Sequence, residues 1–76
     1  MSLPSELHEI RGRLELAYQT LLLAANRVKQ AHDSNDVRDA LGHIRAAHEG
    51  AKAARENLNA AGVLAKAETE KQGRLF

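Results

Sequence analysis

The sequence predicts an all-α fold, an antiparallel two-helix hairpin of the alanine-rich coiled-coil type in a single domain over residues 1–76. Apolar residues recur at alternating spacings of three and four along two long segments, which is the period of one helix face. A short polar run, residues 32–36, separates the two segments. Only 3% of the residues are aromatic, so the chain has no heavy aromatic core.

The first helix is expected over about residues 4–32. Pro4 is the only proline, at a helix start where a missing N–H costs nothing, and Ser2 or Ser5 can cap this end. The apolar stripe of this helix is Leu3, Leu7, Ile10, Leu14, Ala17, Leu21, Ala24, Val28 and Ala31. It stops at the polar run, whose short side chains favour a turn at residues 33–35.

The second helix is expected over about residues 36–70, with Asp36 or Ser34 as its cap. Alanine, the best helix former, dominates it. Its apolar stripe is Val37, Ala40, Ile44, Ala47, Ala51, Ala54, Leu58, Ala61 and Ala65. Gly73 is a natural helix stop, so residues 71–76 are predicted to be a frayed tail.

A short connection predicts antiparallel neighbours. If the chain folds back about Ser34, Leu14 lies opposite Ala54 and Leu21 lies opposite Ala47. A large side chain then faces an alanine in most layers, which lets the layers interdigitate.

Glycines at unusual density support a close helix pair. Gly42, Ala46, Gly50 and Ala54 form a row of small residues at spacing four, and Gly62 lies further along the same helix. Each glycine within a helix costs up to ~1 kcal/mol relative to alanine. We therefore expect a close backbone neighbour at these glycines.

The first helix carries more apolar surface than one partner helix covers. Exposed patches of this kind usually mark association, and two hairpins that pack into a four-helix bundle are a common solution. We therefore expect a homo-oligomer, with a homodimer favoured, or a complex with a cognate protein. The predicted association residues are Leu16, Tyr18, Leu22 and Leu23, with Leu75 and Phe76 as a second contact.

The residues do not favour catalysis, and we expect a chain that is not an enzyme, with no catalytic residue, cofactor or small-molecule substrate. The chain has no cysteine, and the spacing of five between His43 and His48 separates them by about 140° around a helix, so no metal site is expected. Oppositely charged residues at spacing four, such as Arg45 with Glu49 and Lys52 with Glu56, are interpreted as exposed ion pairs.

Nucleic-acid binding is the alternative function, although it is not favoured. Basic residues spaced by multiples of seven form a stripe on the second helix that can track phosphates: Arg38, Arg45, Lys52 and Lys66. Against this, the formal net charge is +1, and no aromatic side chain is placed for base stacking. The sequence shows no signal-peptide core and no membrane span, so we expect a cytoplasmic chain with no membrane role.

Two alanine-rich helices, a short polar turn and a polar tail resemble the small helical-hairpin proteins of type VII secretion, the Trp-x-Gly class, and short hairpin proteins of high-GC bacteria. The resemblance covers residues 5–66 and implies pairing into a four-helix bundle. Where that class has its Trp-x-Gly signature, this chain has Asp33-Ser34-Asn35, and its only tyrosine is Tyr18. No functional residue is therefore carried over from the family.

Overall fold

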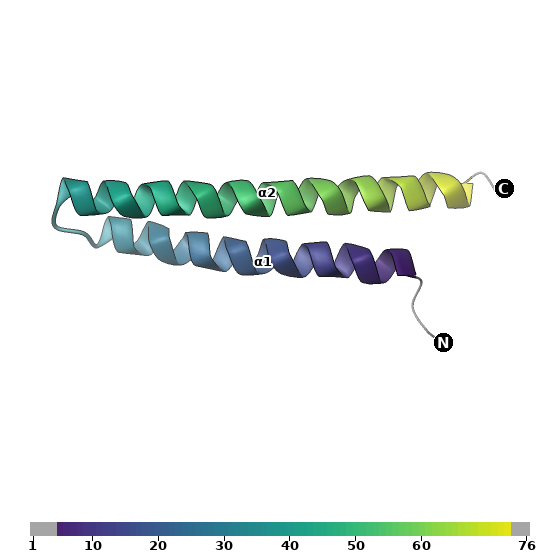
Figure 1. Cartoon of the computed structure of the whole chain (residues 1–76), viewed down its shortest axis with the longest axis horizontal. Coiled ribbons are helices and arrows are strands. Elements are labelled where there is room, and N and C mark those ends of the chain that lie inside the picture. Colours follow the sequence, from purple (N-terminus) through teal and green to yellow (C-terminus); the bar gives the residue numbers. More distant parts are fainter. Residues whose placement is uncertain (1–4, 74–76) are drawn as a thin grey trace.

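The computed structural model describes residues 5–73, with side chains through Lys71. Helix α1, Ser5–His32, and helix α2, Val37–Gly73, lie side by side and run in opposite directions (Figure 1). The molecule measures 59 × 23 × 12 Å along its principal axes. The predicted all-α hairpin is confirmed.

The turn is closed by backbone and side-chain hydrogen bonds at both helix ends. The Asp33 N–H donates to the Lys29 carbonyl at 3.0 Å and extends the last turn of α1. Asp36 caps α2, because its Oδ1 accepts the Arg38 N–H at 3.3 Å and its carbonyl accepts the Ala40 N–H at 2.9 Å. Of the two predicted caps, Asp36 thus satisfies the Arg38 N–H, which would otherwise have no partner at the start of α2. The other, Ser34, accepts the Asp36 N–H through its Oγ at 3.4 Å.

Helix α2 extends further than the sequence predicts. Residues 71–73, assigned above to a frayed tail, are helical through Gly73. The residues before Gly73 include glutamate, lysine and glutamine, which are good helix formers, so the helix continues after its apolar stripe fades. The predicted contacts of Leu3, Leu75 and Phe76 lie outside the described residues.

The core of the hairpin consists of alanines. The buried apolar residues, each 8% exposed or less, are Ala17 and Ala24 on α1 and Ala47, Ala54 and Ala61 on α2. They recur every seven residues on each helix, so they form one straight row per helix. The two helices therefore pack small side chain against small side chain.

Two contacts define the register, and they correct the predicted one. Gly50 lies against Thr20 and Ala24, whereas a fold-back about Ser34 would place it level with Tyr18. Arg27 Nη1 lies 3.1 Å from His43 Nδ1. The helices are thus displaced from the predicted pairing by about two to three residues.

The predicted layers of large side chain against alanine are wrong as well. The five larger residues assigned to the middle of the seam are 44–58% exposed: Leu14, Leu21, Val28, Ile44 and Leu58. Alanine on both helices permits a shorter distance between backbones than a leucine–alanine layer does. The seam is therefore centred on the alanine rows, and the larger side chains are displaced to its flank.

The expected close approach at the glycines is confirmed at one position only. A Cβ on Gly50 would lie 3.2 Å from the Ala24 Cβ and 3.3 Å from the Thr20 carbonyl oxygen. At Gly42 and Gly62 a Cβ would meet nothing within 4 Å. The prediction of a close neighbour is therefore wrong for these two glycines, which lie outside the seam.

Candidate interaction surface

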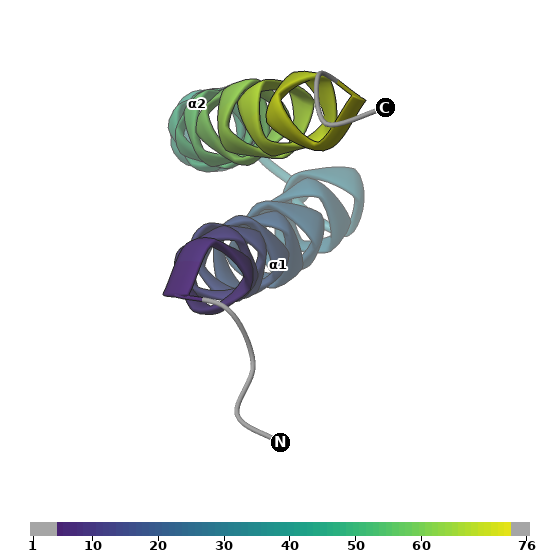
Figure 2. The same cartoon turned by 90° about the vertical axis from the view of Figure 1, so that its right-hand side faces the viewer.

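The hairpin is a single layer of helices and so has two open faces. Its shortest dimension is 12 Å, the diameter of about one helix with its side chains, and the end-on view shows only α1 and α2 (Figure 2). Most domains bury their apolar surface between two packed layers. The two faces of this hairpin therefore show what a second layer would contact.

On one side of the buried alanine rows the seam is bordered by a mostly polar row. We call it the polar face; four of its residues are half-buried between the helices and the two arginines are exposed: Thr20, His43, Gly50, Asn57, Arg13 and Arg27. Arg27 donates to His43 Nδ1, and His43 Nε2 lies 3.5 Å from Asp39 Oδ2. Thr20 Oγ1 donates to the Leu16 carbonyl at 2.9 Å. This face thus satisfies much of its hydrogen-bonding capacity within the hairpin.

The opposite face is apolar. Each of its residues comes directly after a residue of the polar face in the sequence. Consecutive side chains point about 100° apart around a helix, so the two rows lie on opposite sides of the buried alanine row. We call this the apolar face; it consists of Leu14, Leu21, Val28, Ile44, Ala51 and Leu58. The helix contacts place Val28 near Ile44 and Leu21 near Ala51, since Arg27 meets His43 and Thr20 meets Gly50.

The structure separates the predicted association residues of α1. Tyr18 and Leu22, 62% and 50% exposed, flank the apolar face, whereas Leu16 and Leu23, 49% and 64% exposed, lie on the side of the polar face. The other two predicted residues, Leu75 and Phe76, lie outside the described part. One surface therefore cannot use all four described residues at once.

Sequence reasoning missed the apolar face because it placed those residues in the seam. The sequence nevertheless contains a signal for the observed seam. Alanines recur every seven residues on both helices, at Ala17, Ala24 and Ala31 on α1 and from Ala40 and Ala47 onward on α2. Two such rows match each other at a short interhelical distance. This match predicts an alanine seam with the larger residues beside it.

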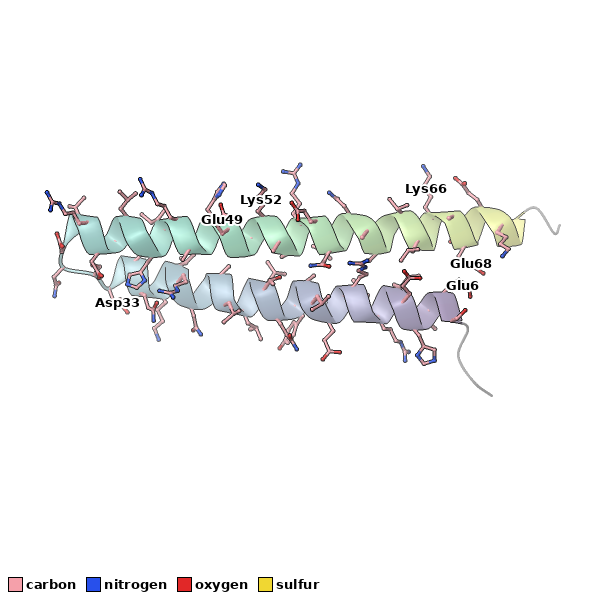
Figure 3. The ribbon with its side chains drawn as sticks, in the orientation of Figure 1. Glu6, Asp33, Glu49, Lys52, Lys66 and Glu68 are labelled. Carbon is pink, nitrogen blue, oxygen red and sulfur yellow. The ribbon has the colours of Figure 1, made fainter. Side chains whose placement is uncertain are left out.

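The predicted basic stripe lies on the edge of α2. Lys52 and Lys66 project from the side of α2 that faces away from α1 (Figure 3). Among the described residues, the ion pairs are His32 with Asp33 and His43 with Asp39. The ion pairs predicted between lysine or arginine and glutamate are not among them.

A shallow, open hollow lies beside this stripe. It is lined by His48, Ala51, Lys52 and Arg55, all from α2, so it adjoins the apolar face at Ala51. The small side chain of Ala51 leaves the hollow open, and the longer side chains of His48, Lys52 and Arg55 form its rim. A hollow of this kind accepts one projecting side chain rather than an enclosed ligand.

The histidines do not converge. Within the described residues, no group of three or more histidine or acidic side chains is placed to hold a metal ion. Neither α1 nor α2, as far as they are described, has a stretch apolar and long enough to cross a bilayer.

The chain matches no known protein-family model, no curated protein and no solved structure. The assignment of a role therefore depends on the two faces and the charged edge.

Proposed function

We propose that this chain is a non-enzymatic protein–protein interaction module that presents its apolar face to helices of a partner, as in a four-helix bundle. The observation that carries the proposal is the row of five larger apolar side chains on one face, each 44–58% exposed. Continuous exposed apolar patches usually mark interaction sites. The heptad spacing of Leu14, Leu21 and Val28 is the spacing by which a helix contacts another helix along its length.

The alanine core supports the same proposal energetically. Five alanines bury little apolar area, and small chains often gain the missing stability from association. Full burial of a leucine, valine or isoleucine side chain contributes about 1.5–3 kcal/mol. Each half-exposed residue of the apolar face therefore has about half of that still to gain from a partner.

Photo-cross-linking in cells that produce the protein tests this proposal. A photoreactive residue replaces Leu21 or Ile44 on the apolar face, and Glu49, exposed on the outer edge of α2, serves as the matched control position. We expect protein adducts from Leu21 and Ile44 and few from Glu49. Adducts from the control position alone, or from none of the three, would refute the proposal.

A small nucleic-acid-associated protein is the second candidate. The observation that favours it is the stripe of Arg38, Arg45, Lys52 and Lys66, none of which forms an ion pair with a carboxylate. A row of cations can bind phosphates in a salt-dependent manner, and against this Glu49 and Glu56 lie one helical turn from the stripe. The double substitution Arg45→Glu with Lys52→Glu should then abolish binding to double-stranded DNA, whereas binding that persists rejects the stripe as the contact.

A further inference from the structure

We propose that the partner on the apolar face is a second copy of this chain, packed with both hairpins pointing the same way, so that Tyr18 of each copy sits in the hollow of the other. This inference rests on the proposed function and adds the identity and the orientation of the partner. Four features of the hairpin support it: the area of the face, the spacing of its side chains, the charge on its edges and the level of the hollow.

The face is large enough for a stable dimer. Helix α1 has 28 residues, which at 1.5 Å per residue span about 42 Å, and the layer is 23 Å wide. The layer therefore presents an outline of roughly 1,000 Å² on this side, with the apolar face along its centre, and a standard interface buries about 800 Å² per partner. The same chain also has 6293 Å² of accessible surface, against roughly 4,600 Å² for a compact monomer of this mass.

A second copy also matches the face in the spacing of its side chains. The apolar face repeats every seven residues on both helices, so a second copy presents the same spacing to it. Self-complementary contact about a two-fold axis closes after two copies. The polar face lies outside in that dimer, where Arg13 and Arg27 remain in water.

Charge on the edges selects the orientation. Two face-to-face arrangements are possible: α2 of one copy lies either on α2 or on α1 of the other. The α2 edge beside the apolar face is strongly basic, with Arg38, Arg45, His48, Lys52, Arg55 and Lys66. Packing α2 on α2 brings these rows together, and like charges in contact are destabilising.

The α1 edge is a better neighbour for this basic row. It carries Tyr18 and Leu22 together with Glu15, Arg11 and Lys29, so it has fewer cations than the α2 edge and one carboxylate to offset them. Contact between α2 and α1 of the second copy requires both hairpins to point the same way, with their turns at the same end. In this arrangement equivalent residues of the two copies lie at the same height along the long axis.

The hollow then lies at the level of Tyr18. Its lining runs from His48 to Arg55, and Gly50 within that span contacts Thr20 and Ala24. The hollow therefore lies at the same height along the long axis as the residues of α1 near Tyr18. The side chain of Tyr18 is 62% exposed. In the dimer the tyrosine ring of one copy packs on Ala51 of the other, and Arg55 there lies against its face as a cation–π neighbour.

Mass measurements test whether the second copy binds this face. Sedimentation equilibrium of the full chain should give twice the single-chain mass of 8.3 kDa. Leu21→Glu should give the single-chain mass, whereas Leu23→Glu, the matched control on the other side of α1, should stay dimeric. A wild-type monomer, a dimeric Leu21→Glu variant or a monomeric Leu23→Glu variant each overturns the proposal.

A distance measurement on the intact dimer tests the orientation without a destabilising change. The chain has no cysteine, so Asn35→Cys in the exposed turn carries a single spin label per copy. With layers about 10 Å apart, labels at the same end should lie within about 30 Å of each other. A separation beyond about 40 Å, close to the length of α1, places the turns at opposite ends and overturns the orientation.

Substitutions of Tyr18 provide a third test of the dimer. Tyr18→Ala should weaken dimerisation roughly tenfold or more, as buried aromatic anchors do, whereas Tyr18→Phe should keep it near the wild-type level. Equal effects of the two substitutions overturn the seating of the ring in the hollow. A chain that is monomeric in solution but cross-links through Leu21 to a different protein in cells overturns the second copy and leaves the proposed function standing.

Discussion

Replacing Gly50 by alanine tests the close approach of the two backbones. Alanine in place of a helical glycine normally stabilises by about 1 kcal/mol. At Gly50 the added Cβ would lie 3.3 Å from a backbone oxygen of Thr20 and 3.2 Å from the Ala24 Cβ. A backbone oxygen yields only if the helices move apart, and such overpacking costs about 1–3 kcal/mol. Gly50→Ala should therefore range from neutral to about 2 kcal/mol destabilising.

Gly42→Ala is the matched control, because a Cβ there meets nothing within 4 Å. It should receive the whole propensity gain and raise the midpoint of thermal unfolding by about 4–8 °C for a domain of this size. Far-UV circular dichroism of both variants at one protein concentration, since association also raises the midpoint, should place Gly50→Ala at least about 4 °C below Gly42→Ala. If both variants gained equally, the helices would not be in close contact at Gly50.

Three further substitutions test the seam, the cap and the polar face. Ala54→Leu, at a position 1% exposed, should destabilise by about 1–3 kcal/mol or more in urea unfolding, whereas Ala67→Leu, at an exposed position of the same helix, should cost much less; similar costs would contradict the alanine seam. Asp36→Ala removes the acceptor for the first turn of α2 and should cost about 1 kcal/mol, and an unchanged urea midpoint would show that the cap contributes nothing. In a double-mutant cycle, Arg27→Ala and His43→Ala should show a coupling of about 0.5–1 kcal/mol; purely additive effects would indicate that the 3.1 Å contact does not stabilise the hairpin.

Much of the fold could be predicted because its signals are local. The polar run before Val37 and the cap at Asp36 predicted the turn, and the three-and-four spacing predicted both helices. The candidate surface was predicted less well. Tyr18 and Leu22 flank the apolar face, but Leu21 was assigned to the seam, although it is 47% exposed. An apolar stripe about 100° wide contains both alanines and leucines, and its period alone does not indicate which edge meets the partner.

The sequence by itself determined the two helices, their boundaries to within a few residues and the fold-back between them. These depend on hydrogen bonds and side-chain preferences within a few residues of each position. Only the tertiary structure decided how far each helix is rotated about its axis and which residues are level. That choice depends on the distance between the backbones, which the alanine rows and Gly50 make short. The same rotation leaves Leu14, Leu21 and Leu58 exposed on one face, where a partner can cover them.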